Sequence, residues 1–198
     1  MRIYNYIFIT LLLLLSSCET FEEDAPFKKF TIKAGKHSSV VRRTNLETPY
    51  LSYDIFFDET AEYYTKDPRN QMDINKLFGF SDCNSLHHQN SIRFGWNWNG
   101  EAIDIYGYHY LDGKLNWKYM GTVEINKVYR YNIYLFEDLL EMEIEGITAN
   151  KVQFNRHNLI CEIGYYYQLF PYFGGDETAP HDINIYFKRN HKPPMYVK

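Results

Sequence analysis

The sequence predicts an all-β protein in which two antiparallel sheets pack face to face as a β-sandwich of the jelly-roll type, with one short helix. Short runs of residues alternate between apolar and polar side chains, as expected for strands with one buried face and one solvated face. Turn-forming residues separate these runs at regular intervals, which gives roughly ten strands. A single sheet of that many strands would curl or split, so two packed sheets are expected. No internal repeat is evident, which disfavours a propeller.

The strongest strand signal lies in residues 90–113, which read as two strands joined at Asn99-Gly100 and closed by Asp112-Gly113. Asn-Gly and Asp-Gly pairs accept positive φ angles and are typical of tight hairpin turns. The first strand places four large apolar side chains on one face: Ile92, Phe94, Trp96 and Trp98. On the second strand, the face opposite the isoleucines holds Asp104, Tyr106, Tyr108 and Tyr110. The pattern predicts an apolar core face and a polar face rich in tyrosine.

Other strands are expected on both sides of this hairpin. Their predicted ranges are 27–33, 49–57, 114–125, 128–136, 139–147, 151–156, 162–170 and 181–188. Residues 72–80 differ, because Ile74, Leu77 and Phe78 recur at helical spacing and a glycine follows them. This segment is the predicted short helix, which we place over an open edge or end of the sheet.

The chain begins with a segment that is set apart from the fold. Arg2 supplies a small positive charge, and residues 7–15 are apolar but far shorter than the roughly 20 residues that a membrane-spanning helix needs. The small residues Ser16 and Ser17 before Cys18 resemble the lipobox of bacterial lipoproteins. That resemblance implies cleavage before Cys18 and acylation of its thiol and amine, and each buried methylene of such an anchor contributes about 0.8 kcal/mol. Residues 1–17 are therefore predicted to be a lipoprotein signal peptide. The alternative is an ordinary secretory signal that contains a cysteine.

Residues 18–26 are expected to be a tether, because acidic side chains follow Cys18 closely and Pro26 ends the run. A short acidic run directly after the lipid-bearing cysteine resembles the surface-export signal of Bacteroidetes-type lipoproteins. The resemblance implies attachment to the outer membrane, with the outer surface favoured over the periplasmic face. Residues 27–190 then form one β-sandwich domain, since a chain of 198 residues fits a single all-β domain.

Charge and cysteine content narrow the expected partners. The chain carries 21 basic and 25 acidic side chains, and its basic residues form nothing longer than pairs such as Lys28-Lys29. A nucleic-acid partner is therefore not expected. Cys83 and Cys161 are able to pair in an oxidising compartment, but the sequence does not show whether their Cα atoms come close enough. No spacing of Cys and His typical of a zinc site occurs, and no cofactor is expected.

Two short segments resemble the concanavalin-like jelly rolls. Residues 181–187 are similar to the closing strand of that family, and residues 143–146 are similar to a strand that runs into a turn. The chain as a whole resembles small uncharacterised surface lipoproteins of gut-type Bacteroidetes. These resemblances imply the sandwich fold and a cell-surface setting, but they imply no specific activity.

A non-catalytic glycan-binding module is the function that we predict for the tyrosine-rich surface. Flat aromatic rings stack on the apolar C–H faces of sugars, while amides, carboxylates and Arg bind the hydroxyl groups. The predicted ligand-binding residues are Arg93, Trp98, Asp104, Tyr106, Tyr108 and Tyr110. Trp98 shares its face with Ile92 and Phe94, so the alternative interpretation is that it belongs to the core. For Arg93, the alternative interpretation is a structural ion pair with Asp104. Exposed tyrosines also suit protein contacts, which makes an accessory role in a surface complex a second interpretation.

A catalytic alternative rests on Glu141, Glu143 and Glu145, which alternate along one strand face. This spacing resembles the E-x-D-x-E signature of retaining glycoside hydrolases on the concanavalin-like fold. The resemblance implies Glu141 as the nucleophile and Glu145 as the acid/base, with the two carboxyl groups about 5 Å apart. Glu143 departs from the family's Asp, and a solvent-facing strand with Met142 and Ile144 turned inward explains the same spacing. An enzyme is therefore the less favoured interpretation.

We predict no metal site, and the alternative is a site for a structural calcium ion. Asp176, Glu177 and Asp182 lie near a Gly-Gly loop. Calcium takes about six to eight oxygen ligands, often from loop carboxylates and carbonyl groups. The spacing matches no calcium-binding motif such as the EF-hand loop, so our first prediction is that these residues hold no metal.

Overall fold

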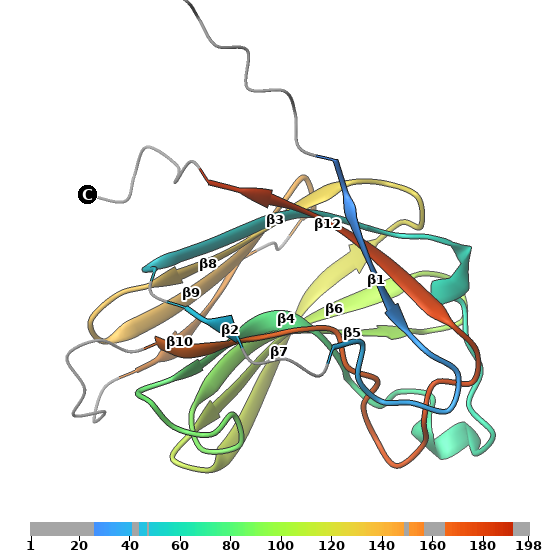
Figure 1. The fold of residues 1–198 in the computed structure, drawn as a ribbon, viewed down its shortest axis with the longest axis horizontal. Coiled ribbons are helices and arrows are strands. Elements are labelled where there is room, and N and C mark those ends of the chain that lie inside the picture. The colour runs from blue at the N-terminus through green and yellow to red at the C-terminus, as the bar shows by residue number, and fades with distance from the viewer. Residues whose placement is uncertain (1–25, 41–43, 47, 149–150, 157–164, 192–198) are drawn as a thin grey trace, which may run out of the picture.

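The computed structural model describes residues 26–40, 44–46, 48–148, 151–156 and 165–191, which form two stacked antiparallel sheets of six strands each (Figure 1). Sheet A has the order β1 (Lys28–Ile32), β12 (Ile183–Asn190), β3 (Tyr50–Phe57), β8 (Tyr129–Leu135), β9 (Leu139–Glu145) and β10 (Lys151–Asn155). Sheet B has the order β2 (Thr44–Asn45), β11 (Tyr165–Leu169), β4 (Asn75–Asp82), β5 (Ser91–Trp98), β6 (Ile103–Leu111) and β7 (Lys114–Val123). The predicted sandwich of antiparallel sheets is confirmed.

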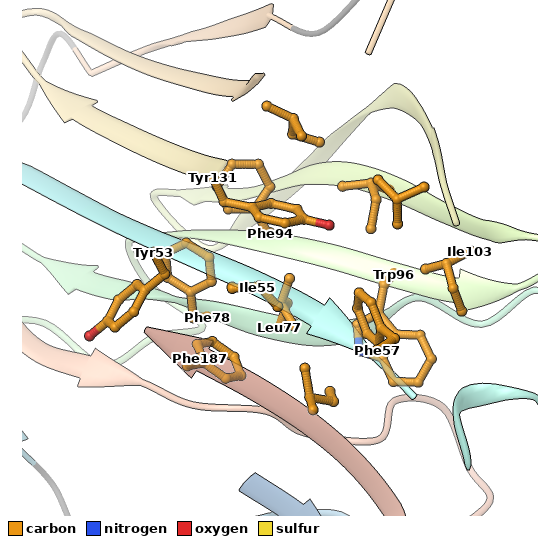
Figure 2. Packing of buried hydrophobic residues seen from close by; sticks show 14 of the residues in the cluster. Tyr53, Ile55, Phe57, Leu77, Phe78, Phe94, Trp96, Ile103, Tyr131 and Phe187 are labelled. Atoms are coloured by element: carbon orange, nitrogen blue, oxygen red, sulfur yellow. The ribbon is translucent and has the colours of Figure 1, made fainter. Parts of the chain in front are cut away.

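The core lies between the two sheets and consists mainly of large aromatic and aliphatic side chains. Figure 2 shows Phe94 beside Tyr131 and Trp96 beside Phe57, so rings from sheet B meet rings from sheet A. The ring centroids of the first pair are 5.1 Å apart, and those of the second pair are 5.0 Å apart. Ile92, Phe94 and Trp96 have no exposed surface, which confirms the predicted inward face of the first hairpin strand. Burying each such side chain stabilises the fold by about 1.5–3 kcal/mol.

The predicted helix at residues 72–80 is wrong, because this segment contributes strand β4 instead. The pairing of β4 with β5 shifts register between Lys76 and Phe78, as in a β-bulge. The side chains of the adjacent residues Leu77 and Phe78 are both buried, so the two-residue alternation is broken at this point. Helical structure in the described chain consists of two short 3-10 turns, Glu59–Ala61 and Pro68–Asn70. No helix in this part of the protein is long and apolar enough to cross a membrane.

The two turns of the central hairpin form at their predicted positions. Gly100 has a φ angle of +102° at the turn between β5 and β6. At the turn between β6 and β7, the φ angles are +51° at Asp112 and +74° at Gly113. Asn, Asp and Gly tolerate this left-handed region better than other residues do. These turns fix the register of β5, β6 and β7, the three strands that carry most of the candidate site.

A buried ion pair ties one end of sheet A to one end of sheet B. Arg156 follows β10 directly, and it donates from Nε to Oδ2 of Asp82 at 2.7 Å and from Nη2 to Oδ1 at 3.2 Å. The two side chains are only 6% and 2% exposed, and Nη1 of Arg156 also donates to the carbonyl of Glu137 at 3.0 Å. The neighbouring Cys83 is disulfide-bonded, and Cys161, whose pairing with Cys83 the sequence leaves open, lies outside the described residues. No pattern in the sequence predicts this charged connection between the sheets.

Candidate functional site on the outer face of sheet B

The outer face of sheet B carries the tyrosines that the sequence predicts on the polar side of the hairpin. Strand pairing arranges the side chains of this face in rows that cross β4, β5, β6 and β7. The central row consists of Gly79, Arg93, Tyr108 and Trp117. The row on one side of it consists of Lys76, Gly95, Tyr106 and Tyr119. The row on the other side consists of Ser81, Ser91, Tyr110 and Leu115. We call the surface formed by these three rows the aromatic face.

Arg93 lies at the centre of the aromatic face. The residue is only 6% exposed, and its guanidinium carbon lies 5.0 Å from the centre of the Tyr108 ring. Its Nε has no hydrogen-bond partner, and none of the ion pairs among the described residues includes Arg93. Burial lowers the pKa of Arg93, while Tyr108 and Tyr110 act in the opposite direction. A buried charge without a counter-charge is costly, so this guanidinium is suited to receive an anion.

Lys76 places a second cation against the same ring. Its Nζ lies 4.7 Å from the centre of the Tyr108 ring and donates to the carbonyl of Ile74 at 2.7 Å. Burial and the charge of Arg93 lower the pKa of Lys76 to about 8, while Asp73 acts in the opposite direction. Like Arg93, Lys76 forms no ion pair within the described part of the chain. Two neighbouring strands therefore each bring one cation to one tyrosine ring.

Histidine and tyrosine side chains from other segments complete one side of the aromatic face. A cavity of about 210 Å³ lies beside Arg93, and its lining includes His87, Tyr167 and Tyr172. Nδ1 of His87 lies 2.9 Å from the hydroxyl of Tyr167. The rings of His88 and Tyr110 have centroids 5.5 Å apart, and burial, followed by the nearby cations, lowers the pKa of His88. The cavity thus combines cationic, aromatic and hydrogen-bonding groups.

Lys76, His87 and Tyr172 are not among the ligand-binding residues that the sequence predicts. The segment of Lys76 is predicted to be a helix, and a helix gives no position for Lys76 relative to Arg93. The observed strand pairs with β5 and places Lys76 one row from Arg93. His87 and Tyr172 lie in loops, which carry no periodic signal. Nothing in the sequence pattern indicates that these loops meet beside Arg93.

Two exposed rings extend the aromatic face over the edge strand β7. Trp117 and Tyr119 are each 53% exposed. The Tyr106 ring lies edge-on to both of them, and each pair of ring centroids is 5.7 Å apart. The hydroxyl of Tyr119 donates to Oδ1 of Asp104 at 3.4 Å. Burial and the charge of Asp104 raise the pKa of Tyr106, so its hydroxyl stays neutral near pH 7.

The structure brings four of the six predicted ligand-binding residues onto the aromatic face, and Asp104 lies in the next row of the same sheet, opposite Asn97 and Thr122. The four residues are less exposed than the sequence pattern predicts. Tyr106 and Tyr108 are each only 7% exposed, because neighbouring side chains cover their rings. Trp98 is a correction, since it is 6% exposed and belongs to the hydrophobic core. The alternative pairing of Arg93 with Asp104 is also wrong, because the register places Tyr108 opposite Arg93. The binding role of the residues on this face stays a prediction.

The glutamates of the catalytic alternative lie on the outer face of sheet A, which is turned away from the aromatic face. Glu141 accepts hydrogen bonds from Lys151 at 2.9 Å and from Gln153 at 2.7 Å. Glu145 accepts one from Asn132 at 3.0 Å. The apolar side chains between these glutamates along β9 are fully buried. These are the surroundings of a solvent-facing strand with partners on both neighbouring strands.

The carboxylates of the calcium alternative have separate partners. Glu177 accepts hydrogen bonds at 2.8 Å from two backbone N–H groups, those of Lys66 and Asp67. Asp182 forms an ion pair with Lys33 at 2.7 Å. Among the residues that the structure describes, no group of three or more His, Cys, Asp or Glu side chains is arranged to hold a metal ion. Asp176 is therefore not part of such a group.

Comparison with known proteins identifies the fold. No family's sequence profile matches the chain, and no curated protein matches it. An alginate lyase from Klebsiella pneumoniae superposes with a TM-score of 0.56 at 13% identity, covering 71% of this chain and 57% of that chain. An alginate lyase from a Chlorella virus superposes with a TM-score of 0.54 at 13% identity, covering 82% of this chain and 82% of that chain. A laminarinase from a Flavobacterium species superposes with a TM-score of 0.53 at 12% identity, covering 81% of this chain and 76% of that chain.

These likenesses support the predicted jelly-roll sandwich fold. The chain spans a little over half of the Klebsiella lyase, 57% of its length. At identities this low, the likeness concerns the fold alone.

Proposed function

We propose that this chain is a lipid-anchored surface protein that binds an acidic polysaccharide on the outer face of sheet B. The observation that carries the proposal is Arg93, a buried guanidinium that faces aromatic rings and has no carboxylate partner in the described chain. A sugar carboxylate would supply the missing counter-charge through a charge-assisted hydrogen bond, which Arg is able to make in bidentate form.

Three further features support an acidic glycan as the ligand. Lys76 adds a second positive charge beside the same ring, so the site favours a ligand with fixed negative charge. Tyr110 is half-buried beside Tyr108, and its ring and hydroxyl group suit the C–H faces and hydroxyls of sugars. The structural neighbours include proteins named for alginate, a polymer of uronic acids, and for laminarin, a neutral glucan. The two cations favour the acidic member of this pair.

The first test compares these two polymers as ligands of the chain without residues 1–18. In native gels, alginate is expected to retard the protein strongly, and laminarin is expected to leave its mobility unchanged. Retardation by alginate is expected to weaken between pH 7 and pH 9. The pKa of Lys76 is about 8, so Lys76 is charged at the lower pH and neutral at the higher pH, and an anion binds the charged form better.

Two results would contradict the proposal. Equal retardation by both polymers would show that charge does not select the ligand. No retardation by alginate or by other uronate polymers such as pectate would remove the acidic glycan altogether. Bovine serum albumin, run in the same gels, controls for changes in viscosity and for non-specific attraction.

Eliminative cleavage of such a polysaccharide is a second candidate function, because phenol, imidazole and amine groups lie beside the guanidinium. In this reaction a base removes the proton next to the carboxylate, and a C=C bond forms between C4 and C5. The C4–O bond breaks, and its electron pair leaves with the oxygen, which then gains a proton. Arg93 would stabilise the charge that develops on the carboxylate. Ultraviolet absorbance of unsaturated uronates after incubation with alginate would favour this candidate over simple binding.

The anchor at Cys18 is part of the proposal, and residues 1–25 lie outside the described part of the structure. The acylated cysteine would hold the domain at the outer membrane of a Bacteroidetes-type cell, where a polysaccharide is accessible. A Cys18→Ser variant is expected to move from the membrane fraction to the soluble fraction, because it loses the site of acylation. Persistence of the variant in the membrane fraction would contradict the anchor. Digestion of the native protein by protease added to intact cells would support the outer surface.

A further inference from the structure

Exposed apolar side chains gather on the edge strand of sheet B. Leu115, Trp117 and Tyr119 occupy alternate positions of β7 and are 46%, 53% and 53% exposed. All three belong to the aromatic face, at the ends of its three rows. The fold does not require large apolar side chains at these positions, because polar side chains would fit a half-exposed edge strand equally well. Their exposure therefore points to a ligand.

The rings of this edge are held in place before any ligand arrives. Tyr106 lies edge-on to both Trp117 and Tyr119, with centroid distances of 5.7 Å. The Tyr119 hydroxyl donates to Asp104 at 3.4 Å, which restrains its ring further. Rings that are already restrained lose less conformational entropy on binding, so a ligand that stacks on them gains more affinity.

The edge is continuous with the cationic centre of the aromatic face. Arg93 on β5, Tyr108 on β6 and Trp117 on β7 are consecutive partners in one row. Neighbouring strands lie about 4.8 Å apart, so the Cα atoms of Arg93 and Trp117 are separated by roughly 10 Å. Two linked pyranose rings are able to cover that span. A polysaccharide with one carboxylate at Arg93 would thus bring its next sugar ring over Trp117.

We propose that Trp117 and Tyr119 form a second subsite, which stacks on the sugar next to the acidic residue held at Arg93, so that the polysaccharide crosses β5, β6 and β7. This inference rests on the proposed glycan function and adds the direction of the chain and a minimum length of ligand. The second subsite binds the apolar face of a sugar ring, so it contributes through contact area rather than charge.

The test is a length series of alginate oligosaccharides, from one to six residues, titrated into the full mature chain in detergent and followed by NMR. The wild-type protein is expected to bind the disaccharide and longer oligomers about tenfold more tightly than the monosaccharide, as one stacked aromatic contact predicts. Trp117→Ala is expected to abolish this gain and to leave the affinity for the monosaccharide unchanged. Trp117→Phe keeps a ring and is expected to retain most of the gain.

Controls separate this inference from the proposed function on which it rests. Tyr64 is 69% exposed but lies outside the aromatic face, so Tyr64→Ala is expected to leave the whole length series unchanged. A length gain that survives in Trp117→Ala would overturn the second subsite, and so would an equal loss for the monosaccharide. If an Arg93→Met variant binds every oligomer as well as the wild type does, the proposed acidic-glycan site itself is overturned. Trp117 is half-exposed, so thermal melting is expected to show a folded Trp117→Ala protein.

Discussion

The Arg93→Met variant is expected to lose at least about a hundredfold in affinity for alginate, which corresponds to about 2.7 kcal/mol. Methionine keeps the length and the apolar contacts of the side chain but removes the charge and every hydrogen-bond donor. Truncating one partner of a buried charge pair typically costs about 2–5 kcal/mol of binding free energy, because the other charge is left without a partner. Isothermal titration calorimetry measures the loss.

The same substitution is expected to leave the melting temperature unchanged or to raise it. In the ligand-free protein, Arg93 is a buried charge with no carboxylate partner in the described chain, so its removal relieves a cost rather than breaking an ion pair. Arg189→Met, an exposed arginine on β12, is the matched control and is expected to bind alginate normally. Arg93→Lys is expected to recover part of the affinity, because lysine retains the charge without the planar fork. A large drop in melting temperature for Arg93→Met would instead assign Arg93 a structural role.

The Arg156→Met variant is expected to lower the free energy of unfolding by about 3–5 kcal/mol. The Asp82 side chain is only 2% exposed, and Arg156 donates two hydrogen bonds to its carboxylate. The substitution removes this charged partner from a carboxylate that is buried. It also removes the donor to the carbonyl of Glu137. The same two residues connect β10 of sheet A with β4 of sheet B, so the loss acts on the contact between the sheets. Chemical denaturation with the disulfide of Cys83 kept oxidised measures the change.

Two further variants test the cause of that loss. The double substitution Asp82→Leu with Arg156→Met removes both charges, and it is expected to recover much of the stability, because apolar replacements of a buried pair are often close to neutral. Arg69→Ala breaks an ion pair whose arginine side chain is 88% exposed, and it is expected to cost less than about 1 kcal/mol. If Arg156→Met costs no more than Arg69→Ala, the buried pair does not stabilise the contact between the sheets.

Local patterns account for the elements that the sequence predicts well. In β5 and β6, side chains alternate with a period of two, and the Asn-Gly and Asp-Gly turns fix where each strand ends. The alternation alone therefore separates Phe94, in the core, from Arg93, on the outer face. The same alternation places Trp98 in the core, so its assignment to the ligand-binding set went against the pattern of its own strand.

The error at β4 has a local cause as well. A bulge between Lys76 and Phe78 makes the adjacent residues Leu77 and Phe78 both face the interior, so that the apolar residues recur with helical spacing. The pairing of β4 with β5 overrides that apparent period, because the strand gains a ladder of backbone hydrogen bonds and a buried face. The sequence carries no separate signal for the bulge.

The sequence by itself determined that the chain forms alternating antiparallel strands, and which side chains of the central hairpin face inward and outward. Only the tertiary structure decided which strands and loops lie beside the central hairpin, and therefore that Lys76, His87, Tyr167 and Tyr172 join Arg93. Alternation is a property of each strand alone, whereas the order β11-β4-β5-β6-β7 depends on how two whole sheets bury their apolar faces together. A site built across five strands is for this reason set by packing, and no single segment of the sequence contains it.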